Sequence, residues 1–190
     1  MTLASFLRTV VSVLEESGTP YMLTGSLAGA YYSLPRATQD IDFVLDPGRD
    51  QVEDLVRRFT ERGYYVSSTA AQEAVRHHGQ FNVVDPETGW KVDLIIRKDR
   101  TFSTEEFSRR RPAEVLGVSV SLTSPEDLIL AKLEWAKLGD SALQRRDVAQ
   151  LARFRWESLD HDYIDRWAVE LGTKDNWDLI VAAVRSEREP

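Results

Sequence analysis

The sequence predicts a mixed α/β (α+β) fold, in which helices cover a mixed sheet and a C-terminal helical bundle follows. Two observations predict this architecture. Over residues 1–123, segments with helical spacing of apolar residues alternate with short apolar runs typical of strands. Over residues 124–190 only helical spacing is present, interrupted by short polar breaks. The expected organisation is therefore a sheet-bearing domain over 1–123 and a helical region over 124–190 packed on it.

Composition narrows the classes of protein that this chain can represent. It has 190 residues, which suffice for a sizeable core, and no cysteine, which excludes disulfides and thiolate metal sites. It shows neither a run of about eighteen apolar residues nor a signal peptide, so we expect a cytoplasmic protein without a membrane partner. A net charge of −7 argues against nucleic-acid binding over the whole surface, although Arg109–Arg111 and Arg145–Arg146 form local basic patches.

The first elements follow from spacing and from turn residues. Residues 3–16 repeat apolar side chains at helical intervals, and residues 21–24 form a short apolar run typical of a strand. Gly25 and Ser26 indicate a tight turn before a small-residue helix over 27–32, which Pro35 ends. The further expected elements of this domain are a strand over 40–45, a helix over 49–62, a strand over 64–66, a hairpin over 80–84 and 90–96, a loop or short helix over 98–111, and short strands within 115–120.

The second half begins with a strong helix start. Ser124 is suited to cap a helix whose first position is Pro125 and whose first turn contains two acidic residues. The later segments with helical spacing are 145–154, 163–171 and 177–184.

Two carboxylates in the strand over 40–45 are the most informative local feature. Strand alternation places Asp40 and Asp42 on one face, with Ile41 and Phe43 on the other. Unpaired, the two carboxylates would repel each other, whereas a divalent cation satisfies both with hard oxygen ligands. This pattern predicts a Mg²⁺ (or Mn²⁺) site.

A third carboxylate and an anion-binding turn accompany this pair. Asp93 lies in another apolar strand, where aspartate is disfavoured unless it has a function. The Gly25–Ser26 turn opens a helix whose free amide groups favour anions, and the Ser26 hydroxyl can donate to a phosphate oxygen. The three features together indicate metal-assisted phosphoryl transfer on a bound triphosphate.

In this order, the Gly-Ser turn, the Asp40-Ile41-Asp42 strand and Asp93 make the chain resemble the DNA polymerase β-like nucleotidyltransferase superfamily. Within it, Arg36-Ala37-Thr38-Gln39 before Asp40 is similar to the minimal AbiEii-type enzymes of toxin–antitoxin and abortive-infection systems. The resemblance is good over the first half of the chain and looser as far as Asp147.

The resemblance implies an enzyme of nucleotidyl transfer. It would move a nucleoside monophosphate from an NTP such as ATP to an acceptor hydroxyl of RNA, a protein or a small molecule such as an aminoglycoside, with release of pyrophosphate. Asp40, Asp42 and Asp93 would hold the metal, and Asp93 would also activate the acceptor. The implied nucleotide-binding residues are Gly25, Ser26, Arg36, Thr38 and Lys132. A cognate toxin or antitoxin is an implied partner.

Plainer interpretations stand beside these. An Asp-x-Asp strand is often the solvated face of an edge strand, Arg36 and Thr38 can belong to a simple connecting loop, and Lys132 can be a surface lysine. The same fold can also serve as an inactive nucleotide-binding or antitoxin-like module. A helical interaction protein without a site is the third alternative.

Overall fold

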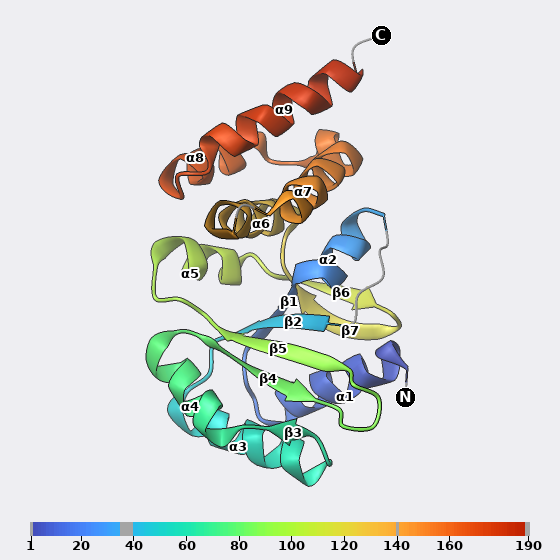
Figure 1. Ribbon diagram of the computed structural model, residues 1–190, viewed down its shortest axis with the longest axis vertical. Coiled ribbons are helices and arrows are strands. Elements are labelled where there is room, and N and C mark those ends of the chain that lie inside the picture. Colours follow the sequence, from blue (N-terminus) through green and yellow to red (C-terminus); the bar gives the residue numbers. More distant parts are fainter. Residues whose placement is uncertain (1, 35–39, 140, 189–190) are drawn as a thin grey trace. The chain divides into compact units, whose positions relative to one another are not determined.

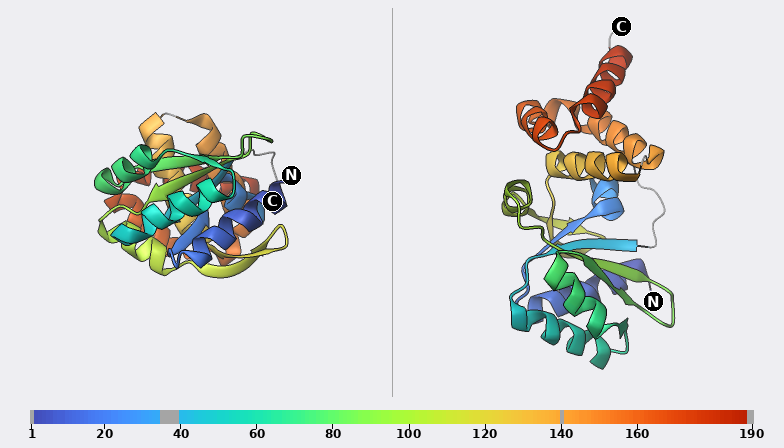
Figure 2. Two further views of the ribbon diagram at one scale, coloured as in Figure 1. Left: turned by 90° about the horizontal axis from the view of Figure 1, so that it is seen from below. Right: turned by 60° about the vertical axis from the view of Figure 1, so that its left-hand side comes forward.

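The computed structural model describes residues 2–34, 40–139 and 141–188 (Figures 1 and 2). The contacts between residues divide the chain into two compact units. The first comprises Met1–Leu27 and Ala37–Thr123, and the second comprises Ala28–Arg36 and Ser124–Pro190. Within the described residues, no helix combines the length and the apolar character needed to span a bilayer.

The first unit is built on one mixed sheet. The described residues form seven strands in the order β3-β4-β5-β2-β1-β7-β6. Their bounds are β1 Tyr21–Thr24, β2 Asp40–Leu45, β3 Tyr65–Val66, β4 Gln80–Val84, β5 Lys91–Ile96, β6 Arg111–Val115 and β7 Val118–Leu122. The pairs β2–β5 and β1–β7 are parallel, and the other four pairs are antiparallel. The predicted mixed sheet is thus confirmed.

One face of this sheet carries the core. In β2, Ile41, Phe43 and Leu45 are fully buried, whereas the residues that alternate with them are at least partly exposed. Helices α1, α3 and α4 lie on that face of the sheet in Figure 1. The helices of this half of the chain are α1 Leu3–Glu16, α2 Gly25–Tyr32, α3 Arg49–Glu61, α4 Ser68–His77 and α5 Thr101–Ser108. The aspartates therefore lie on the face opposite to the apolar core.

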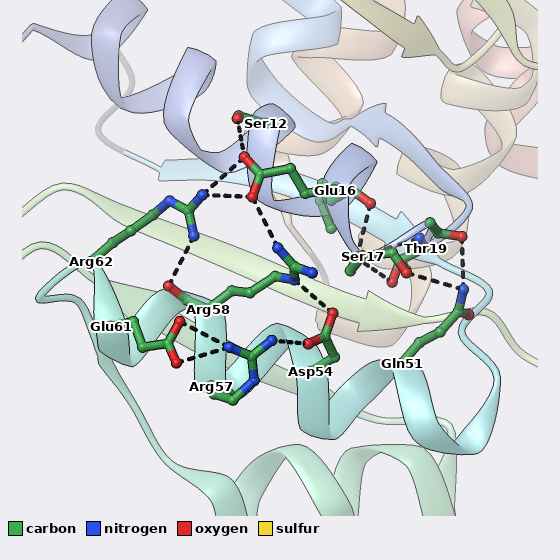
Figure 3. A network of polar contacts seen from close by, with 12 residues as sticks. Ser12, Glu16, Ser17, Thr19, Gln51, Asp54, Arg57, Arg58, Glu61 and Arg62 are labelled. Atoms are coloured by element: carbon green, nitrogen blue, oxygen red, sulfur yellow. Dashed lines mark hydrogen bonds and ion pairs between the residues drawn. The ribbon is translucent and has the colours of Figure 1, made fainter.

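A network of charged side chains joins α1 to α3 (Figure 3). Glu16 of α1 accepts hydrogen bonds from Arg62 at 2.7 Å and from Arg58 at 3.0 Å. The hydrogen bond that Ser12 donates, followed by the contact with Arg62, lowers the pKa of Glu16 below its ordinary value. Because these side chains are partly exposed to solvent, each ion pair alone adds little to the stability of the fold.

The second unit is helical. Its helices are α6 Pro125–Gly139, α7 Ala142–Arg155, the short 3₁₀ helix η1 Trp156–Ser158, α8 His161–Glu170 and α9 Lys174–Arg188. Ser124 accepts a hydrogen bond from the Asp127 amide at 3.1 Å, so the predicted cap is confirmed. The Tyr163 hydroxyl of α8 donates to the buried Asp127 carboxylate at 2.6 Å, and this bond connects α8 to the first turn of α6.

A buried ion pair joins α6 to α7 within this unit. The Lys132 ammonium lies 2.9 Å from Asp147 and 3.0 Å from the Gln144 side-chain oxygen. The side chains of Lys132 and Asp147 are only 5% and 9% exposed. Gly29 of α2 also lies against this lysine, since a Cβ atom there would come 3.8 Å from Lys132 Cε.

The structure corrects the sequence-based elements at three places, apart from shifts of a few residues at the ends of other elements. Gly25 and Ser26 begin α2 instead of preceding it, the stretch from Ser68 to His77 is a helix that was not predicted, and β6 runs over Arg111–Val115 instead of lying within 115–120. Of the two conformations expected over 98–111, a loop or a short helix, the structure has the helix, α5. The proposed division into domains 1–123 and 124–190 stays a prediction.

Candidate active site

The two central carboxylates are neighbours on adjacent strands. Asp42 of β2 pairs directly with Asp93 of β5 in the parallel register, so both side chains lie on the same face of the sheet. Neighbouring strands lie about 4.8 Å apart, a separation that lets two carboxylates approach one ion. β2 and β5 lie side by side in the middle of the sheet (Figure 1). Asp40 lies two residues before Asp42, on the same face, and its side chain is 53% exposed.

Gly25 lies beside the Asp42 carboxylate, directly after the end of β1. Thr24, the last residue of β1, pairs with Asp42, and Gly25 then enters α2 with φ +67°. A Cβ atom at position 25 would lie 1.9 Å from Asp42 Oδ2 and 2.5 Å from Asp42 Cγ. Glycine is thus required here twice, for its backbone conformation and for the space that the Asp42 carboxylate occupies.

Lys91 is a site residue that the sequence argument missed. Its ammonium lies 3.2 Å from Asp93 Oδ2 and 3.6 Å from Asp40 Oδ1. Burial disfavours its charged form, but the hydrogen bond to Asp93 and the charges of Asp93 and Asp40 outweigh that effect and raise the pKa of Lys91. The signal was present in the sequence, because a residue two positions before Asp93 in a strand shares its face.

Asp93 is only half satisfied. Its side chain is 14% exposed, and its buried Oδ1 atom has no hydrogen-bond partner among the residues that the structure describes. A buried carboxylate oxygen without a partner is costly, so an additional ligand is expected there. The adjacent pair Asp42–Asp93 with this oxygen fits a divalent cation that prefers oxygen ligands.

The full three-carboxylate set is not gathered at one point. Among residues 2–34, 40–139 and 141–188, no group of three or more acidic, histidine or cysteine side chains is close enough together to hold a metal ion. Asp40 lies one pleat repeat, about 7 Å, along β2 from Asp42, which separates it from the paired ligands. Its place in the metal site stays a prediction.

The other predicted binding residues have different outcomes. Gly25 and Ser26 lie at the start of α2, next to Asp42. Arg36 and Thr38 fall outside the described residues. Lys132 lies in the second unit and is not the surface lysine of the plainer interpretation, since it is buried against Asp147. The structure does not test the nucleotide-binding roles predicted for these residues.

Comparison with known proteins gives the fold. The chain is similar over 97% of its length, and over 96% of the other chain, to the antibiotic-resistance factor ANT(2'')-Ia, with a TM-score of 0.57 and 13% identity. A nucleotidyltransferase-like antigenic protein from Paracoccidioides brasiliensis matches 96% of the chain with 92% of its own, at a TM-score of 0.56 and 15% identity. This chain has the nucleotidyltransferase fold.

The lincosamide antibiotic adenylyltransferase LnuA, solved with lincomycin bound, shares the nucleotidyltransferase fold over 80% of this chain and 96% of its own, at a TM-score of 0.51 and 12% identity. No family model and no curated protein matches the sequence. At identities this low, the structural similarity establishes the fold alone, and it confirms the predicted fold class. The AbiEii-type subfamily stays a prediction.

Proposed function

We propose that this protein transfers a nucleoside monophosphate from an NTP to an acceptor hydroxyl and uses Mg²⁺ or Mn²⁺ for the transfer. The observation that supports the proposal best is the direct pairing of Asp42 with Asp93 beside Gly25 at the start of α2. In a chain with the nucleotidyltransferase fold, this arrangement combines two oxygen ligands with a helix start that favours phosphate.

Charge explains why a cation is needed in this arrangement. The amide groups at the start of α2 favour a triphosphate, and Gly25 and Ser26 would seat it. The Asp42 carboxylate lies against the same helix start and would repel a triphosphate. A divalent cation held by Asp42 and Asp93, with Asp40 as the third predicted ligand, would supply the positive charge that lets the Asp42 carboxylate and the triphosphate lie close together.

The reaction places a defined demand on Asp93. The acceptor oxygen forms a bond to the α-phosphorus while the bond from that phosphorus to the pyrophosphate oxygen breaks. The acceptor proton passes to a carboxylate oxygen of Asp93, and pyrophosphate leaves. Positioning and charge neutralisation account for most of the rate in such reactions, so neither histidine nor cysteine is required.

The acceptor is proposed from the comparisons and from charge. ANT(2'')-Ia was solved with adenylyl-2''-tobramycin and LnuA with lincomycin, both antibiotic compounds. The net charge of −7 suits a cationic or neutral small molecule better than RNA. We infer a small hydroxyl compound as the acceptor. An RNA or protein acceptor in a toxin–antitoxin pair is the alternative that the sequence resemblance implies.

The test uses the four NTPs labelled on the α-phosphate, Mg²⁺, and a panel of aminoglycosides, lincosamides, total RNA and cell protein. We expect label transfer by the wild type and by Asp99→Asn, an exposed acid in the loop after β5, and at least a 100-fold loss in Asp42→Asn. The labelled product identifies the acceptor class.

Two other outcomes have distinct meanings. Mg²⁺-dependent NTP binding without transfer to any acceptor would favour the inactive nucleotide-binding module. Absence of both binding and transfer, in a folded protein, would overturn the proposed function.

A further inference from the structure

The strand register places a lysine inside the acidic site. Lys91 pairs with Asp40 across β5 and β2 and lies two residues before Asp93 on the same strand. Its ammonium lies 3.2 Å from Asp93 Oδ2 and 3.6 Å from Asp40 Oδ1, and its side chain is one-third exposed. The positive charge thus lies on the same face of the sheet that carries the proposed metal ligands.

A lysine in this position competes with a divalent cation. The Asp93 carboxylate gives one oxygen to Lys91, and its other oxygen, Oδ1, is buried without a hydrogen-bond partner in the described part of the chain. A dication bound to the same carboxylate would lie within a few ångströms of the ammonium, and like charges at that distance repel. Binding of the metal ion to Asp93 and the ion pair of Lys91 with Asp93 therefore oppose each other.

We propose that Lys91 is the resident counter-ion of the acidic site: it neutralises Asp93 while no metal is bound and releases this ion pair when a divalent cation binds. The inference rests on the proposed function, because it assigns the metal to the Asp42–Asp93 pair. Lys91 then has two effects, which are to stabilise the metal-free site and to weaken its affinity for the metal.

The two effects are linked by thermodynamic reciprocity. If the Lys91–Asp93 ion pair lowers metal affinity by a given factor, bound metal lowers the equilibrium constant for forming that ion pair by the same factor. Coupling between two sites typically amounts to about 5- to 150-fold in affinity. The positive charge of Lys91 also offsets the repulsion between the Asp93 and Asp42 carboxylates. Removal of Lys91 should therefore make the stability of the fold more dependent on bound metal.

The experiment measures Mn²⁺ binding by calorimetry, without nucleotide, in four proteins. Lys91→Met removes the charge, Lys91→Arg keeps it, and Lys98→Met makes the same change at an exposed position beyond the end of β5. We expect Lys91→Met to bind Mn²⁺ about 5- to 150-fold more tightly than wild type, and the other two variants to stay within about threefold of it.

Thermal unfolding gives a second measurement that does not depend on catalysis. With EDTA, Lys91→Met should unfold at a lower temperature than Lys98→Met, and added Mn²⁺ should raise its unfolding temperature by more than it raises that of wild type. Circular dichroism before heating verifies that each variant is folded. Lys91→Arg should behave as the wild type does.

The outcomes separate this inference from the proposed function. Mn²⁺ binding of equal strength in wild type and Lys91→Met would overturn the inference and keep the metal site. Binding by Lys91→Met when wild type binds no Mn²⁺ would support the inference in its strongest form. No binding by either protein would overturn both.

Discussion

Gly25→Ala tests the geometry of the site without changing any charged group. The added methyl group would lie 1.9 Å from Asp42 Oδ2, whereas non-bonded carbon and oxygen atoms stay more than 3.0 Å apart. The Asp42 carboxylate must therefore move by about 1 Å or more. A displacement of that size at reacting or ligating groups costs about 100-fold in rate.

Backbone strain adds a separate cost that a control variant can isolate. Alanine at φ +67° is disfavoured by about 1–2 kcal/mol in unfolding free energy. Gly63 has φ +82°, and a Cβ atom there would meet nothing within 4 Å. Gly63→Ala thus carries a similar strain of about 1–2 kcal/mol but leaves Asp42 where it is.

The assay compares Mn²⁺ affinity and urea unfolding of the two variants. We expect both to lose about 1–2 kcal/mol of stability from strain, with Gly25→Ala losing more from overlap. Only Gly25→Ala should bind Mn²⁺ more weakly and lose transfer by about 100-fold. Equal Mn²⁺ affinity in Gly25→Ala and wild type would refute the reasoning that Gly25 positions Asp42.

Three further outcomes follow from the surroundings of Lys132, Tyr21 and Glu16. Lys132→Met should lower the free energy of unfolding in urea by about 3–5 kcal/mol, because it leaves the Asp147 carboxylate buried without its cation. A second change in the same protein, Asp147→Leu, should recover most of that loss. A loss below about 1 kcal/mol in Lys132→Met would contradict the buried ion pair. Burial raises the pKa of Tyr21 to about 12, so its contribution to stability is complete below pH 10 and is lost as the pH rises towards 12; an alkaline absorbance titration should show one tyrosine near 12 that Tyr21→Phe removes. The pKa of Glu16 is lowered, so its contribution is present at neutral pH and is lost as the pH falls below the ordinary carboxyl range; Glu16→Gln should flatten the acid side of the stability profile, and an unchanged profile would count against the network in Figure 3.

Much of the fold follows from local patterns. The strand over 21–24 is confirmed at both ends, because all four of its residues are buried, and α1 begins and ends where the apolar spacing of its one buried face predicts. Helix α4 was missed because only Ala71 and Ala74 are buried in it, and two small side chains give a weak periodic signal. Strand β6 contains Pro112 and exposed polar residues, so its pairing with β7 determines its conformation.

In the candidate site too, local patterns predicted some features and long-range contacts determine the others. Alternation within a strand predicted that Asp40 and Asp42 share a face, and the register of β2 with β5 then brings Asp93 beside Asp42. That register is a long-range property, which local spacing cannot specify. The ion pair of Lys132 with Asp147 joins two helices and was likewise inaccessible to reasoning from single segments.

The parallel pairing of β2 with β5 has a consequence for the kinetics of folding. Two helices and two strands separate these strands in sequence, so the contact between Asp42 and Asp93 closes a long loop of the chain. A cation that needs both carboxylates can bind only where this contact has formed. The proposed metal should therefore slow unfolding more than it changes the refolding rate, and the half-life of the folded protein in a cell should depend on how often the site is occupied.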